Sequence, residues 1–295
     1  MGSLNLSAVK EKKRVAFFSV LAAIFITTFK LIIGLLTGSI GIISEALHSA
    51  LDFVAATITF FAVRISNKPA DKDHHFGHGK IENFSALIET LLLLATCIWI
   101  IYEATHRLVT GKVIIEVNVW SYIVVITSII VDYTRSKALL KAAKKHNSQA
   151  LEADALHFST DIWSSTVVLI GLISANLGYY YADSIAALFV AVIVITVSYR
   201  LGKRSVDALM DKTPKDTMEK IDEVLKKIPE VISYHSVKIR TSGANIFVEI
   251  NIHVDPKLSI EKAHLISHKV QSDLRKKIKG CITHVHEEPA IQKNK

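Results

Sequence analysis

Residues 15–36 read VAFFSVLAAIFITTFKLIIGLL, an apolar run interrupted by one charged side chain, Lys30. A helix needs about 20 consecutive apolar residues to cross the hydrocarbon layer of a bilayer, and this run is long enough. The run therefore predicts a membrane-spanning helix, with the Lys30 ammonium extended toward the membrane surface. No small-residue cleavage site follows it, so we expect the helix to stay in the protein.

Five further apolar runs follow the first one. They span residues 42–63, 84–102, 119–140, 153–177 and 182–199. The residues beyond them are charged and mixed, and they contain no run of this kind. We therefore predict an α-helical membrane protein with six transmembrane helices over residues 1–204, followed by a separate C-terminal domain over residues 205–295.

Lysine and arginine residues are concentrated on one side of the predicted bundle. They precede the first run and occur in the segments after the second, fourth and sixth runs, whereas the other side receives only Arg107 and Lys112. Because cytoplasmic loops are enriched in these residues, we expect both termini and the C-terminal domain in the cytoplasm, with the helices in the plasma or inner membrane. The same loops account for the net charge of +8, so we expect no nucleic-acid partner.

The C-terminal domain has a recognisable order of patterns. The expected elements are a helix over 215–228, strands over 235–240 and 246–254, a helix over 259–278 and a strand over 282–286. Gly243 lies in a turn signal between the first two strands, and Ser259 is a suitable N-cap for the second helix. The order helix, strand, strand, helix, strand predicts a ferredoxin-like α+β domain.

Two of the apolar runs contain a histidine and an aspartate four residues apart. His48 and Asp52 lie in the second run, and His157 and Asp161 lie in the fifth. Each pair shares one helix face, and ionisable groups in a membrane point toward a bundle interior or a wet cavity. Two nitrogens and two carboxylate oxygens complete a tetrahedral Zn2+ shell. The alternative is two separate buried hydrogen bonds, but the repetition of the pair favours one metal site.

The loop after the second run is rich in potential metal ligands. Between Asp71 and His78 it contains three histidines and two aspartates, a density typical of metal-binding segments. A solvated loop with incidental histidines is the alternative.

The C-terminal domain contains six histidines, several of which share a face of their element. His284 and His286 alternate along a predicted strand and so face the same way. His264 and His268 lie one turn apart on a predicted helix. A domain this small rarely needs six histidines, although a single surface histidine needs no explanation.

These features together resemble the cation diffusion facilitator family over nearly the whole chain. They are the six apolar runs, the two His-x3-Asp pairs, the Phe76-Gly77-His78-Gly79-Lys80 segment and the ferredoxin-like domain. The resemblance implies a homodimeric transporter that exchanges Zn2+ or a related divalent metal for protons by alternating access. It implies that the two His-x3-Asp pairs form the transport site, and that Asp71, His74 and His78 form a loop metal site.

The resemblance also implies further sites, with two departures from the family pattern. His235, His264, His286 and Glu288 match a metal site at the dimer interface of the C-terminal domains, and Lys80 with Asp211 matches a salt bridge at the junction. Asn251 stands where some members have histidine, and His253 offers a ligand two residues later. His48 stands where some members have aspartate, which favours borderline metals such as Zn2+, Cd2+, Fe2+ or Co2+ over Mn2+.

Two other function classes can be weighed against an antiporter. An intramembrane metalloprotease would need a His-Glu-x-x-His motif, which the sequence lacks, and an open coordination position for water. A passive channel would need to bind the ion weakly in order to conduct it. A metal sensor would use the C-terminal domain for signalling. We therefore expect a transporter rather than an enzyme, with Zn2+ as its substrate and also as a structural or regulatory ion in the C-terminal domain.

Overall fold

The computed structural model describes residues 6–110, 119–176 and 182–290. The chain divides into two compact units. One unit, the helical bundle, comprises residues 4–68 and 81–206; the other comprises chiefly residues 69–80 and 207–295. The loop before the third helix is thus grouped with the C-terminal domain.

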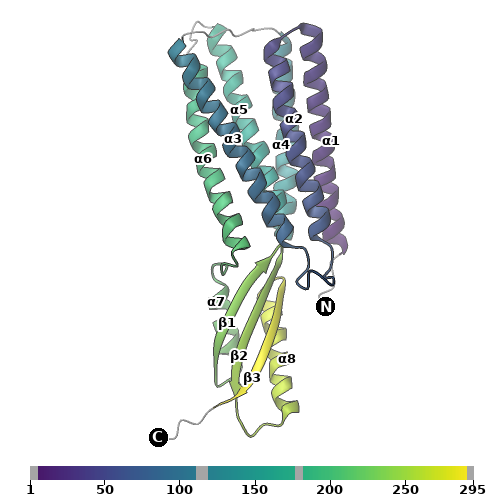
Figure 1. The fold of residues 1–295 in the computed structure, drawn as a ribbon, viewed down its shortest axis with the longest axis vertical. Helices are drawn as coiled ribbons and strands as arrows, with labels where there is room; N and C mark the ends of the chain where they lie inside the picture. The colour runs from purple at the N-terminus through teal and green to yellow at the C-terminus, as the bar shows by residue number, and fades with distance from the viewer. Residues whose placement is uncertain (1–5, 111–118, 177–181, 291–295) are drawn as a thin grey trace. The chain divides into compact units, whose positions relative to one another are not determined.

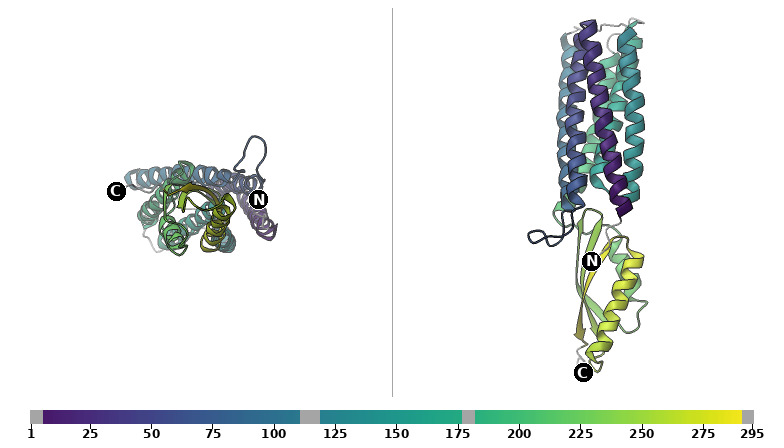
Figure 2. Two further views of the ribbon diagram at one scale, coloured as in Figure 1. Left: turned by 90° about the horizontal axis from the view of Figure 1, so that it is seen from below. Right: turned by 90° about the vertical axis from the view of Figure 1, so that its right-hand side faces the viewer.

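The long helices of the bundle run alongside one another (Figures 1 and 2). They are α1 (Leu6–Thr37), α2 (Ile40–Ser66), α3 (Lys80–Thr110), α4 (Val119–His146), α5 (Gln149–Asn176) and α6 (Ala182–Leu209). Each helix contains one of the predicted apolar runs; the end of the fifth run, Leu177, lies outside the described residues. Gly38, with a φ of 66°, makes the tight turn between α1 and α2, a backbone conformation that favours glycine.

Four of the helices are long and apolar enough, by length and composition, to cross a membrane: α1, α2, α3 and α6. The described parts of α4 and α5 do not reach that level of apolarity. These two helices carry buried polar groups, including Asp132, Arg135, Asp154 and His157, which lower their hydropathy. The membrane-spanning character of α4 and α5 therefore stays a prediction.

Small side chains bring four of the helices close together. α1 packs on α2 and α4, and α5 packs on α4 and α2. The contacts between them include the fully or nearly buried Ala16, Ala56, Ala142 and Ala150. α3 contacts α6 through a smaller apolar cluster around Cys97, whose Sγ donates to the Ala191 carbonyl at 3.2 Å.

The C-terminal domain is a three-stranded sheet with two helices. Its elements are α7 (Thr217–Leu225), β1 (Ser233–Ser242), β2 (Asn245–Val254), α8 (Ile260–Lys277) and β3 (Cys281–Pro289). The strand order is β1-β2-β3, with β1 antiparallel and β3 parallel to β2. Ile250, Ile252, Val270 and Leu274 are fully or nearly buried between the sheet and the helices. The predicted order of elements is confirmed, and Ser259 caps α8 through the Lys262 amide.

Candidate metal centres

The two His-x3-Asp pairs of the bundle meet at the contact between α2 and α5. His157 Nε2 lies 3.1 Å from Asp52 Oδ1 and 3.7 Å from Asp161 Oδ2. His48 Nε2 lies 3.7 Å from Asp161 Oδ1 and 4.0 Å from Asp52 Oδ1. For each histidine the shorter contact runs to the aspartate of the other helix. The four side chains therefore form one cluster rather than two separate pairs within the helices.

This cluster is buried and has unused coordinating capacity. Asp52 is 8% exposed and His157 is 4% exposed. Among the described residues, Asp161 Oδ2 and His157 Nδ1 are buried without a hydrogen-bond partner. Buried polar atoms normally have partners, so the donor set fits a cation that would occupy the space between the side chains.

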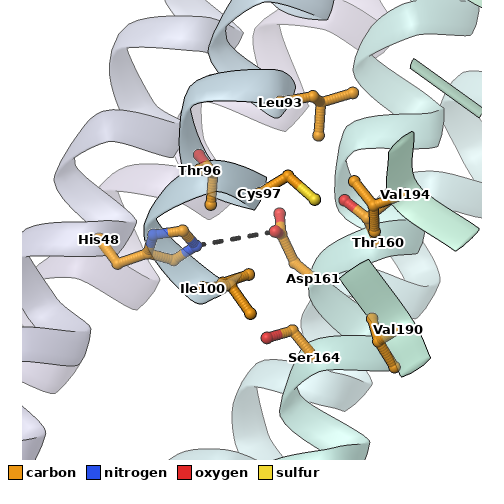
Figure 3. Close-up of a pocket in the computed structure, with 10 residues that line it drawn as sticks. All are labelled: His48, Leu93, Thr96, Cys97, Ile100, Thr160, Asp161, Ser164, Val190 and Val194. Atoms are coloured by element: carbon orange, nitrogen blue, oxygen red, sulfur yellow. Dashed lines mark ion pairs between the residues drawn. The ribbon is translucent and has the colours of Figure 1, made fainter. Parts of the chain in front are cut away.

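A small cavity adjoins the cluster on the side of α3 and α6. Its volume is about 20 Å3, enough for roughly one water-sized particle. His48 and Asp161 face each other across it, and Thr96, Cys97, Thr160 and Ser164 complete its polar lining (Figure 3). The cavity therefore joins the metal cluster to helices that supply none of its ligands.

Two buried cations of the bundle, Lys30 and Arg135, are paired with carboxylates outside the cluster. Lys30 Nζ lies 3.0 Å from Glu45 Oε2, and Arg135 lies 3.2 Å from Asp132 Oδ1. Lys30 is 4% exposed, so the prediction that its ammonium reaches the membrane surface is wrong: a carboxylate on α2 holds it inside the bundle. With these cations paired to other carboxylates, Asp52 has only histidine partners within ion-pair distance in the described part of the chain.

The three predicted loop residues also lie together. Asp71 Oδ1 is 3.3 Å from His74 Nδ1, and Asp71 Oδ2 is 3.4 Å from His78 Nε2. The His74 backbone N–H donates to the Asp71 carboxylate at 2.8 Å. This hydrogen bond is the main cause that lowers the pKa of Asp71, which keeps its carboxylate ionised and able to bind a cation. His78 Nδ1 is buried without a hydrogen-bond partner among the described residues.

The loop packs against the β1–β2 hairpin of the C-terminal domain. The ring of Phe76 lies 5.3 Å from that of Phe247, and the Arg240 guanidinium lies 3.5 Å above the Phe76 ring. A Cβ at Gly79 would meet the Ser242 carbonyl oxygen at 2.5 Å, so this close approach requires glycine.

The predicted junction salt bridge also lies in this unit. Lys80 Nζ lies 2.8 Å from Asp211 Oδ1 and 3.3 Å from the Leu209 carbonyl oxygen. The side chains of Lys80 and Asp211 are 39% and 45% exposed. Exposed ion pairs of this kind contribute about 0–1 kcal/mol to folding stability.

Three residues of the sheet form a third group of potential ligands. His235 Nε2 and His253 Nε2 lie 3.0 Å and 3.4 Å from Glu288 Oε2. The strand register explains this, because His253 is paired with Glu288 and His235 is paired with Asn251. Asn251 Nδ2 donates to the other Glu288 oxygen at 2.7 Å. The hydrogen bond with His235 is the main cause that lowers the pKa of Glu288.

The two remaining predicted residues of this domain are placed differently. His286 Nε2 lies 3.8 Å from Glu288 Oε1, and its side chain is 61% exposed. His264 is not part of the group; its Nε2 lies 3.0 Å from His268 Nε2. The reason is the orientation of α8, which buries Ile266 and Val270 toward the sheet and leaves His264 exposed.

Comparison with known proteins agrees with these observations. Residues 16–210 match the cation efflux transmembrane domain, and residues 213–290 match the cytoplasmic domain of cation efflux proteins. The chain belongs to the cation diffusion facilitator family, and it is accordingly a multi-pass membrane protein of a family of cation efflux transporters.

Its relatives match it over most of their length. The chain is 33% identical over 267 residues to an uncharacterized transporter of Methanocaldococcus jannaschii, covering 90% of this chain and 94% of that protein. It is 28% identical over 274 residues to the cation-efflux pump FieF of Shewanella oneidensis, covering 92% of each chain. It is 29% identical over 262 residues to the magnetosome protein MamB of a Magnetospira species, covering 88% of each.

Proposed function

We propose that the chain exports a divalent metal, Zn2+ foremost, in exchange for protons by alternating access. The observation that carries the proposal is the convergence of His48, Asp52, His157 and Asp161 at the contact of α2 and α5. Two imidazole nitrogens and two carboxylate oxygens suit tetrahedral Zn2+. They suit Mn2+ less, because Mn2+ prefers oxygen ligands.

Charge balance at this cluster supports proton exchange. The two carboxylates carry a charge of about −2, which either Zn2+ or the protons of two histidines would offset. Ligands release protons when they bind metal, and protonation expels the metal. An imidazole nitrogen can hold either a proton or a metal ion, so His48 and His157 are suited to this exchange.

The direction of transport follows from the predicted topology. The excess of lysine and arginine supports cytoplasmic termini and an arrangement in the plasma or inner membrane. Protons that reach the site from the outside would displace Zn2+ from its ligands, and the metal would leave the protein on that side. The chain would act as a homodimer, with a transmembrane domain over residues 1–204 and a dimerisation domain over residues 205–295.

The other two ligand groups fit regulatory or structural metal sites outside the transport path. Asp71, His74 and His78 offer ligand atoms within 4.8 Å of one another, as do His235, His253 and Glu288. Asn251 contributes by orienting Glu288 rather than by binding metal itself. His264 and His286 are exposed, so a second protomer could reach them in a shared site at the dimer interface.

A flux assay in reconstituted vesicles tests the proposed function. The purified chain is placed in vesicles with a trapped zinc dye, and an imposed proton gradient is varied at constant membrane potential. The proposal expects Zn2+ flux to follow the size and sign of the proton gradient, with Mn2+ carried poorly. Zn2+ flux that does not change with the proton gradient would refute antiport and indicate a passive channel.

A further inference from the structure

We propose that Glu82 is a gating residue, a latch that closes the cytoplasmic end of the transport path. The inference rests on the proposed alternating access. The latch lies at the end of the bundle where α1, α3 and α5 begin and α2 and α4 end, here called the basal end.

The Glu82 carboxylate accepts hydrogen bonds from three other parts of the bundle. Lys12 Nζ on α1 donates at 2.8 Å, and Ser66 Oγ on α2 donates at 2.9 Å to the same oxygen. Ser148, which directly precedes α5, donates to the second oxygen. Glu82 and Ser148 are each 1% exposed, and Lys12 is 6% exposed. One side chain of α3 thus ties this helix to α1, α2 and α5.

α3 is attached to its neighbours in a different way from the rest of the bundle. α1, α2, α4 and α5 pack through small apolar side chains. In the basal half of α3 the contacts with this group include polar ones: Asn83 donates to Gln149 at 2.7 Å, and Glu89 accepts from Thr59. Farther along α3, Cys97 shares an apolar cluster with Val167 of α5. Apolar contacts resist separation in water, whereas a charged contact at the water-facing end of a helix can be exchanged for hydration.

The latch lies at the basal end, and the metal cluster lies deeper in the bundle. Ser66 is roughly 20 Å from Asp52 along α2, at 1.5 Å per residue. Between them Val63, Leu139, Leu151 and Phe158 are buried in one apolar cluster. With the latch formed, the path from the cluster to the basal end is closed. Alternating access requires that end to open, and the basal half of α3, which makes these polar contacts, is the part that would move.

Cys97 provides a reporter for this movement. It is fully buried and lines the cavity beside His48 and Asp161. The full chain has one other cysteine, Cys281, so Cys281→Ser leaves a single thiol. The measurement is the rate at which a membrane-impermeant maleimide labels Cys97, without metal, in intact cells and in inside-out vesicles.

Weakening the latch should expose Cys97 to the cytoplasmic side. Glu82→Gln and Lys12→Met are expected to raise labelling in inside-out vesicles about tenfold, the effect of losing one charge-assisted hydrogen bond. The double reversal Lys12→Glu with Glu82→Lys should restore the slow rate. Glu11→Gln is the matched control, because Glu11 pairs with Lys145 and His146 of α4 at the same end without involving α3.

The latch also predicts a specific kinetic change. Favouring the inward-open state should lower KM for Zn2+ supplied from the cytoplasmic side and lower Vmax with it. A purely structural role would reduce the amount of folded protein and leave KM unchanged. A wild-type labelling rate in folded Glu82→Gln, or an increase seen only in intact cells, would overturn the latch. Because labelling needs no metal, failure of wild-type Zn2+ transport would instead refute the proposed function.

Discussion

Replacing Asp52 by asparagine removes one carboxylate from the metal cluster while keeping the size of the side chain. The Asp52 side chain is 12% exposed and has His157 Nε2 3.1 Å away. Without it, a bound Zn2+ would face only one carboxylate, and the site would keep an uncompensated positive charge. Leaving a buried charge without its partner costs about 3–5 kcal/mol, which is a loss of roughly 100-fold to 4,000-fold in Zn2+ affinity at about 1.4 kcal/mol per tenfold.

Asp71→Asn in the loop is the matched control for this change. The Asp71 side chain is 50% exposed, so solvent screens its charge and the same substitution should affect transport much less. The assay is Zn2+ flux in vesicles, together with thermal unfolding of each variant. Asp52→Asn should abolish flux and still give a cooperative unfolding transition. If Asp52 and His157 form only a buried hydrogen bond, Asp52→Asn will lower stability and leave Zn2+ flux intact, and the transport site is then misassigned.

Three further predictions concern selectivity, the C-terminal domain and topology. His48→Asp replaces a borderline nitrogen by a hard oxygen and keeps four ligands, so flux of Mn2+ relative to Zn2+ should rise; an unchanged metal preference across a panel would contradict the assignment of His48. In a full-length chain that already carries Asp71→Ala, His253→Ala should weaken Zn2+ binding measured by calorimetry. His284→Ala, on the same sheet, should leave Zn2+ binding unchanged. Equal effects of the two changes would show that His253 does not belong to the site. Single cysteines introduced at Lys72 and Lys215 should react with an impermeant reagent only from the cytoplasmic side, and labelling from outside would reverse the proposed direction of transport.

The sequence was most informative where structure is determined locally. Helical spacing alone places His48 with Asp52, and His157 with Asp161, on shared faces. The length of the apolar runs predicts the helices, and alternation predicts the strands of the C-terminal domain. The Asp71–His78 loop is short, so its ligands are close together in the sequence as well as in space.

Contacts between distant segments could not be predicted in the same way. The shorter contact of each transport-site histidine runs between helices and depends on how α2 packs on α5. Lys30 and Glu45 are paired across two helices, which no periodicity reveals. In the C-terminal domain the parallel register of β2 and β3 brings His253 beside Glu288. That register depends on α8, whose packing also leaves His264 out of the group.

The most direct test of the account counts the protons released when Zn2+ binds to the transport site. Asp71→Ala and His253→Ala would disable the loop and C-terminal ligand groups in the full-length chain, so that the α2–α5 cluster is the remaining strong site. Calorimetric titration with Zn2+ in buffers of different ionisation enthalpy then gives the number of protons released. The account predicts binding of one Zn2+ per chain with net proton release near neutral pH, lost in Asp161→Asn. Binding without proton release, or binding that survives Asp161→Asn unchanged, would contradict it.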